Sequence, residues 1–208
     1  MSIWFFISLA GMVLDIPLLF LSVEHIRLES KYGKDKGLNI GKILGMISGW
    51  SYFLFWFGIW ISPQPRFTIP FLNLTLFVIP LLNISIPLFH LILFIPFIIL
   101  GIWFGIVGVK GTTLKVSETH KAEKVVTSGV YSTIRHPQYF GGVLSHIGIT
   151  FFLSSLYSLI STPLIILINI MLCWKEEKEL IKEFGNDYTD YKKNVPMFFP
   201  KLKRNDKK

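Results

Sequence analysis

The sequence predicts an all-α membrane protein with about five transmembrane helices and one short re-entrant or interfacial segment. Of its 208 residues, 51% are hydrophobic and only 16% are charged, whereas charged residues make up about a quarter of a typical soluble domain. Apolar runs recur along the chain, and a run of about 20 apolar residues is long enough to cross a bilayer as a helix. The composition therefore indicates an integral membrane protein.

The net charge of +8 is concentrated in three basic stretches, residues 27–42, 110–124 and 192 onward. Basic stretches beside apolar runs are typical of cytoplasmic loops and of contacts with anionic lipid headgroups. We therefore expect membrane lipid, and no nucleic acid, as a partner. The single cysteine excludes an internal disulfide, and the scattered histidines lack carboxylates at ligand spacing, so we expect no metal centre.

The first span is predicted at residues 3–23. No basic segment precedes this apolar run, so we expect a retained membrane helix and not a cleaved signal peptide. Asp15 lies inside the run, and a carboxylate at that depth should face the interior of a helix bundle. Two interpretations stay open for Asp15, a proton or ligand contact and a plain hydrogen bond to a neighbouring helix.

The next segments follow from the distribution of charge. Residues 24–39 hold several lysines and an arginine, so they are predicted as a cytoplasmic loop. Residues 40–61 are predicted as the second span, and the proline-rich turn at 62–66 as an outer loop. The short run at 67–82 is interrupted by polar and proline residues, so it is predicted as re-entrant or interfacial, and residues 86–109 as the third span.

The last two spans are predicted as a tight hairpin on either side of residues 154–155. The apolar run 139–153 forms its first arm. The second arm resumes through Thr162-Pro163, a pair typical of a helix start, and continues past the membrane to a stop at Gly185. Five crossings place the N-terminus outside and the C-terminus in the cytoplasm. We divide the chain into N-terminal membrane helices (1–110), a cofactor-binding half (111–200) and a basic tail (201–208).

The polar chemistry is concentrated in residues 127–142, TSGVYSTIRHPQYFGG. Pro137 is predicted to begin a helix, with Arg135 and His136 directly before it. The unpaired N–H groups at a helix start favour an anion such as a carboxylate. Tyr131 and Tyr139 offer aromatic faces for an adenine ring or a cationic sulfonium.

A second cluster, Glu176 and Glu177, returns to the same membrane face after the hairpin. These carboxylates suit ribose hydroxyls or an α-amino group. The two clusters together fit a zwitterionic nucleoside such as S-adenosylmethionine, although other nucleotides stay open. Each cluster alone also fits a plain structural role, with Arg135 and His136 reaching toward lipid phosphates and the glutamates on a solvated helix face. Walker, HExxH and GxSxG motifs are absent from the sequence, and without regular strands no soluble dinucleotide fold can form.

The sequence GVYSTIRHPQYFGG, followed after the hairpin by EEKELIKEFGNDYTDYKKNVPMFFP, resembles the isoprenylcysteine carboxyl methyltransferase family and its phospholipid methyltransferase relatives. The resemblance covers residues 124–200. It implies a membrane methyltransferase that binds S-adenosylmethionine between the two clusters at the cytoplasmic face, with a lipophilic acceptor entering from the bilayer. The cofactor contacts that it implies are Val125, Val126, Tyr131, His136, Pro137, Gln138, Tyr139 and Glu176.

Two departures from the family pattern bear on the acceptor. Leu172 stands where the prenylcysteine enzymes carry an arginine that orients the substrate carboxylate, and Glu123 replaces a histidine before the first motif. Lys175 is the nearest cation to Leu172 in the sequence, so it is predicted as the substrate-binding residue. Catalytic roles are predicted for Arg135 and Glu177, with Glu177 or His136 taking a proton from an amine or hydroxyl acceptor. The acceptor is therefore left as a prenylcysteine carboxylate or a related lipid.

Two other functions remain open. Membrane lipid and sterol reductases that use NADPH resemble the same C-terminal pattern, although more spans and more basic residues would be expected of them. A non-enzymatic membrane protein with a degenerate site is the other. The many isoleucines and lysines, with no endoplasmic-reticulum retrieval signal at the C-terminus, lead us to expect a prokaryotic cytoplasmic membrane.

Overall fold

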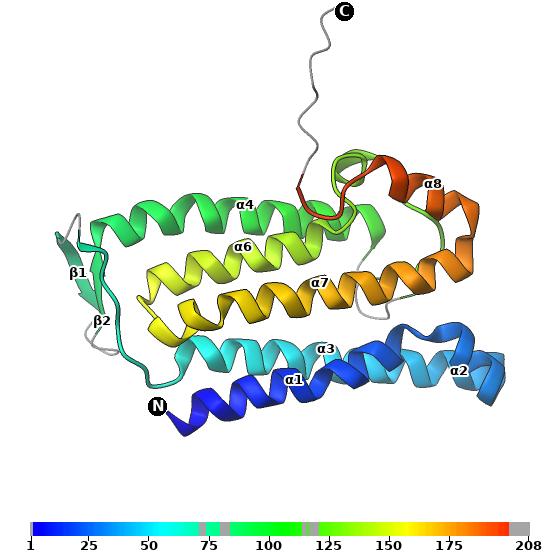
Figure 1. The fold of residues 1–208 in the computed structure, drawn as a ribbon, viewed down its shortest axis with the longest axis horizontal. Helices are drawn as coiled ribbons and strands as arrows, with labels where there is room; N and C mark the ends of the chain where they lie inside the picture. The colour runs from blue at the N-terminus through cyan, green and yellow to red at the C-terminus, as the bar shows by residue number, and fades with distance from the viewer. Residues whose placement is uncertain (1, 71–73, 80–83, 114–115, 117–120, 200–208) are drawn as a thin grey trace, which may run out of the picture.

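The computed structural model describes the chain except residues 1, 71–73, 80–83, 114–115, 117–120 and 200–208. It is a bundle of helices that lie side by side along the long axis of the molecule (Figure 1). The long helices are α1 (Ile3–Val23), α3 (Lys34–Ile61), α4 (Leu88–Thr112), α6 (Pro137–Phe152) and α7 (Leu156–Phe184). Short helices close one end of the bundle: α2 (His25–Tyr32), η2 (Gly129–Ser132) and α8 (Asn186–Asn194). The predicted all-α membrane fold is confirmed.

All five predicted spans are present as helices. Helices α1, α3, α4 and α7 are long and apolar enough to cross a membrane. Helix α6 has 16 residues, which at 1.5 Å per residue span about 24 Å, less than the roughly 30 Å of a bilayer core. The outward faces of these helices are rich in exposed large apolar side chains, as expected where lipid is the solvent.

Two predictions about helix boundaries were wrong. Residues 24–39 form α2 and the first turns of α3 in place of a loop. The two helices are separated at Gly33, whose φ of 84° is a conformation that glycine adopts readily. Helix α7 begins at Leu156, so Pro163 lies inside it and does not start it. The Thr162 hydroxyl donates to Ser158 O one turn back, within the helix and not at a helix start.

The run predicted as re-entrant or interfacial contains a β-strand. Strand β1 (Thr75–Ile79) pairs antiparallel with β2 (Ile84–Pro87), which leads directly into α4. The prediction that the chain has no regular strands was therefore wrong. Residues 71–73 and 80–83 of this run lie outside the described residues. The hairpin lies at the end of the bundle opposite α2 and α8 (Figure 1), which is an interfacial position for a bundle that spans a bilayer.

The bundle consists of two closely packed helix pairs, α1 with α3 and α4 with α6, and α7 packs against both. Gly141 permits the close approach of α6 to α4, because a Cβ there would lie 2.6 Å from Gly101 O and 2.8 Å from Gly105 N. Helices α3 and α6 face each other across the gap between the pairs, where the Trp56 ring lies 3.3 Å from the Cβ position of Gly142. This gap holds the candidate site.

Candidate functional site

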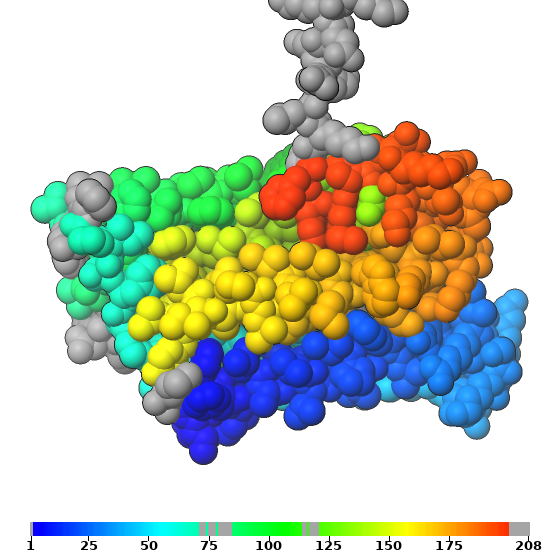
Figure 2. All heavy atoms as spheres, in the orientation of Figure 1, coloured from blue at the N-terminus to red at the C-terminus, as the bar shows by residue number. Residues whose placement is uncertain are grey.

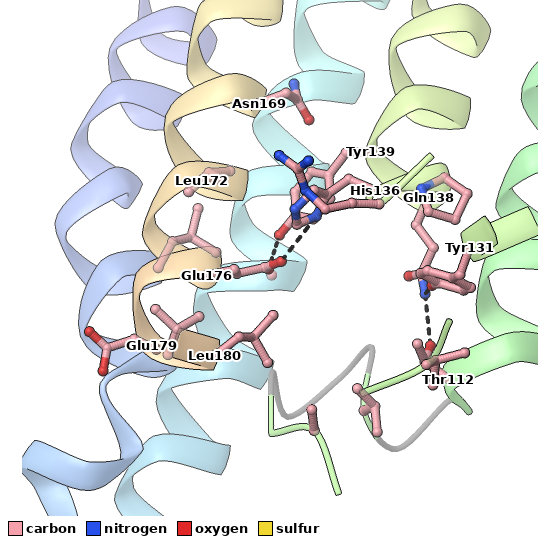
Figure 3. Close-up of a pocket in the computed structure, with 18 of the residues that line it drawn as sticks. Thr112, Tyr131, His136, Gln138, Tyr139, Asn169, Leu172, Glu176, Glu179 and Leu180 are labelled. Atoms are coloured by element: carbon pink, nitrogen blue, oxygen red, sulfur yellow. Dashed lines mark hydrogen bonds and ion pairs between the residues drawn. The ribbon is translucent and has the colours of Figure 1, made fainter. Parts of the chain in front are cut away.

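A cavity of about 450 Å³ opens between the two helix pairs toward the end of the bundle that carries α2 and α8. All eight residues predicted to bind the cofactor line it: Val125, Val126, Tyr131, His136, Pro137, Gln138, Tyr139 and Glu176. Five of them are labelled in Figure 3: Tyr131, His136, Gln138, Tyr139 and Glu176. Helices α1 and α3 line the opposite wall with apolar side chains, among them Leu19, Val23 and Phe53. One cavity therefore has a polar end, near α2 and α8, and an apolar end that reaches into the bundle.

The polar end begins at the start of α6. Pro137 is the first residue of this helix and His136 its N-cap, as the sequence predicted. The N–H groups of Arg135 and His136 donate to Pro196 O and Met197 O, at 3.0 and 3.2 Å. The segment that follows α8 therefore binds the turn before α6 and holds it in place.

The turn is also held from α8. Tyr191 donates a hydrogen bond to Tyr131 O at 2.7 Å, and burial raises the pKa of Tyr191 so that its hydroxyl stays protonated. In the space-filling view, α8 and residues 195–199 lie over this end of the bundle (Figure 2). Residues some 60 positions apart in the sequence thus build one wall of the site.

Glu177 lies at the centre of a buried ionic cluster and not among the residues that line the cavity. Its side chain is 1% exposed and lies 2.6 Å from Arg135 Nε, 2.7 Å from Lys192 Nζ and 3.2 Å from His136 Nε2. Arg135 also donates to Lys192 O and Val195 O. The two residues predicted as catalytic therefore join α7 to the turn before α6 and to the end of α8.

Glu176 is the carboxylate that faces the cavity (Figure 3). The Tyr139 hydroxyl donates to Glu176 Oε1, and His136 Nδ1 lies 3.7 Å from Oε2. Since the first turn of α6 and its N-cap supply both groups, the carboxylate from α7 is held at a fixed position at the edge of the cavity.

Gln138 and Tyr131 form the facing wall. Gln138 donates to the Thr112 hydroxyl at 3.0 Å, and Tyr131 donates to Gly108 O at 3.0 Å. Burial raises the pKa of Tyr131, so the phenol remains neutral. This wall presents hydroxyl and amide groups without a charge.

Lys175, predicted to bind the substrate, does not line this cavity. Its ammonium group lies 2.5 Å from Glu24 and 3.3 Å from Glu179. Burial would raise the pKa of Glu24, but hydrogen bonds from Lys175 and Arg27 outweigh it and hold the pKa below its usual value. Lys175 therefore ties α7 to the junction of α1 and α2.

Several residues that line the cavity were not predicted from the sequence. They come from α2, α3 and α7: His25, Tyr52, Trp56, Asn169, Glu179 and Glu183. Trp56 is held by a 2.9 Å hydrogen bond from its indole nitrogen to His146 Nδ1. A signal existed for Asn169, because a lone amide inside an apolar span usually faces a bundle interior. Among the residues that the structure describes, no group of three or more histidine, cysteine, aspartate or glutamate side chains is arranged to hold a metal ion.

Comparisons with known proteins match the second half of the chain. Residues 89–187 match the family model described as Phospholipid methyltransferase. Protein-S-isoprenylcysteine O-methyltransferase from Mus musculus is 35% identical over 95 residues, which cover 42% of this chain and 31% of that protein. Methanethiol S-methyltransferase from Pseudomonas deceptionensis is 35% identical over 85 residues, 36% of this chain and 28% of that protein.

The matched region thus spans less than a third of the length of these two relatives. The family-model match contains the start of α6, Glu176 and the Arg135–Glu177 pair, and it begins after α1 and α3. The predicted resemblance is confirmed for this half of the chain. The apolar wall of the cavity, in contrast, comes from helices that precede the match.

Proposed function

Because residues 89–187 carry the sequence pattern of the phospholipid methyltransferase family, we propose that the protein is an S-adenosylmethionine-dependent methyltransferase of the membrane. It acts on a lipid-like acceptor. One observation carries the proposal: a single cavity joins all eight predicted cofactor residues to the apolar wall of α1 and α3. A polar donor and an acceptor with a hydrocarbon tail can meet in such a cavity.

The residues present fit the donor. The cavity volume of about 450 Å³ lies within the roughly 300–1,000 Å³ of ligand pockets. Glu176 faces the cavity and suits the ribose hydroxyls or the α-amino group, while the start of α6 beside His136 suits the carboxylate. The Tyr131 ring and the side chains of Val125 and Val126 suit the adenine. When bound, S-adenosylmethionine supplies a methyl group on a positively charged sulfur.

Because this donor is intrinsically reactive, the main task of the protein's side chains is to position the donor and the acceptor. Tyr139 fixes the Glu176 carboxylate, and Arg135 with Glu177 fixes the turn before α6. Helix α8 covers the polar end and excludes water, which strengthens every polar contact beneath it. We assign Arg135 and Glu177 to positioning, since both are engaged with each other.

A thiol, amine or hydroxyl acceptor must also lose a proton. The acceptor's lone pair forms the new bond to carbon, and the electron pair of the broken carbon–sulfur bond stays on the donor sulfur. His136 lines the cavity and lies beside two carboxylates, so it is placed to take the proton. A carboxylate or thiolate acceptor needs no such base.

The bundle orientation follows from the same assignment. Helix α2, which carries Arg27 and Lys31, lies at the polar end with α8. The N-terminus lies at the opposite end of the bundle, where the β1–β2 hairpin is (Figure 1). Basic segments favour the cytoplasmic side. We therefore propose that the polar end of the cavity and the C-terminus face the cytoplasm and the N-terminus faces outward. The acceptor enters from the bilayer.

Calorimetric binding to the detergent-purified protein tests the proposal. S-adenosylmethionine should bind the wild type, bind Glu176→Ala at least about tenfold more weakly, and bind the exposed control Asp187→Ala normally. Binding of NADPH alone would assign the protein to the membrane reductases. Binding of neither ligand would favour a non-enzymatic protein.

A further inference from the structure

One face of α7 lines the whole depth of the cavity. Asn169, Leu172, Glu176, Glu179 and Glu183 recur at spacings of three and four residues, and all five line the cavity (Figure 3 labels the first four). At this spacing they lie on one side of the helix. The face changes along its length from a neutral amide, through a leucine, to three carboxylates at the polar end.

The nearby cations are occupied by these and other carboxylates. Arg135 and Lys192 pair with Glu177, and Lys175 pairs with Glu24 and Glu179. The basic side chains that line the described part of the cavity, apart from Arg135, are His25, Lys124 and His136. They come from α2, from residues 121–128 and from the start of α6, which all belong to the polar end. The proposed methyl donor carries a carboxylate of its own, and these basic side chains are placed to bind that carboxylate.

The depth of the cavity around Leu172 offers neutral hydrogen-bonding groups instead. Asn169 and Tyr52 line it from α7 and α3, and they are only 2% and 8% exposed. Asn169 Nδ2 donates to Ile165 O at 2.8 Å and lies 3.5 Å from the Tyr52 hydroxyl. Within the described part of the chain, Asn169 Oδ1 accepts no hydrogen bond.

An unsatisfied amide oxygen at this depth favours a ligand that can donate a hydrogen bond. A thiol or an amine carries such a proton, whereas a carboxylate has none to donate. A carboxylate would also lie beside Oδ1 without a cation, which is costly for a buried charge. The Asn169 amide therefore favours an acceptor that donates a hydrogen bond over one that ends in a carboxylate.

We infer that the acceptor's reacting group is a hydrogen-bond donor without a negative charge, such as a thiol or an amine, that Asn169 and Tyr52 hold in place of a cation at position 172. This inference rests on the proposed function and narrows the class of acceptor. On this inference, the carboxylate of a prenylcysteine is not the preferred acceptor.

The test measures binding of three probes to the full-length protein loaded with S-adenosylhomocysteine in detergent. The probes share a farnesyl tail and end in a thiol, an amine or the carboxylate of N-acetyl-S-farnesylcysteine. The thiol or the amine should bind at least about tenfold more tightly than the carboxylate. Asn169→Leu should remove this preference, whereas Ile170→Leu, on the lipid-facing side of the same helix, should retain it.

Leu172→Arg supplies the converse test. A guanidinium at this position should improve binding of the carboxylate probe about tenfold. If the wild type binds the carboxylate probe as tightly as the thiol and amine probes, the inference is overturned while the proposed function stands. Failure of S-adenosylhomocysteine to bind, or of every probe to bind the loaded protein, would overturn the proposed function itself.

Discussion

Tyr139 donates a hydrogen bond to Glu176 at the edge of the cavity, the tyrosine from α6 and the glutamate from α7. The phenol donates and the carboxylate accepts, so an uncharged tyrosine holds the negative charge of Glu176 in position. The two residues come from the two sequence motifs that flank the hairpin. Their contact is where the two motifs form one site.

Tyr139→Phe should weaken binding of S-adenosylmethionine about tenfold, because a hydrogen bond to a charged group contributes roughly 1.5–3 kcal/mol. The aromatic ring and its packing remain, so the unfolding midpoint should change little. Calorimetry of the variant checks this expectation. Tyr157→Phe, which removes a hydroxyl elsewhere in the bundle, is the control, and equal affinities of wild type and Tyr139→Phe would contradict the role of the hydrogen bond.

Glu177→Gln should destabilise the fold by about 3 kcal/mol, since removing one partner from a buried ion pair leaves the other charge uncompensated. Arg135 and Lys192 would both lose their carboxylate. Chemical unfolding in detergent, followed by circular dichroism, measures the loss. Glu183→Gln, on an exposed part of α7, should change stability by less than about 0.5 kcal/mol. A Glu177→Gln variant as stable as the control would show that the ionic cluster contributes nothing to folding.

Gly141→Ala should destabilise the α4–α6 pair by about 1–3 kcal/mol, because the added methyl would meet the backbone of α4 below 3.0 Å. Gly105→Ala is the matched control, since nothing lies within 4 Å of the Cβ position of Gly105. It should be neutral or slightly stabilising. Thermal unfolding of the two variants in the same detergent distinguishes them, and equal midpoints would contradict the close packing.

The ion pair between Glu24 and Lys175 should make stability depend on pH at the acid side. The pKa of Glu24 is lowered in the folded protein, so its contribution is fully present above 4.5, the value of a free glutamate. It is lost as the pH falls through the lowered pKa. The contribution is small, less than about 1 kcal/mol for a pair with solvent access. Glu24→Gln should remove this part of the acid dependence in unfolding measurements between neutral and acid pH, and an unchanged pH profile would contradict it.

The sequence was sufficient to predict the five long helices, four of which are long and apolar enough to cross a membrane, and the polar residues of the second half. Hydrophobic length predicted these helices, and Pro137 and Gly185 predicted the start of α6 and the end of α7. The eight predicted cofactor residues line one cavity because the hairpin between α6 and α7 returns the chain to the same end of the bundle. Their role as cofactor contacts remains a prediction.

The partners of charged side chains could not be predicted from sequence position. Lys175 and Glu176 are neighbours in the chain, yet a helix turns them about 100° apart, so one faces Glu24 and the other the cavity. Tyr52 reaches the site from a helix that no motif marks. The strands β1 and β2 were missed because the apolar residues of a short run fit a buried helix equally well.

The backbone bonds from Arg135 and His136 to Pro196 and Met197 also set the order in which the site can be made. The long helices are complete by residue 184, but the turn before α6 has no acceptors for these two N–H groups until residues 196 and 197 are in place. A shortened chain that ends before residue 196 would therefore hold every long helix and an unfinished site, so folding of the bundle and completion of the site are separate events for this protein.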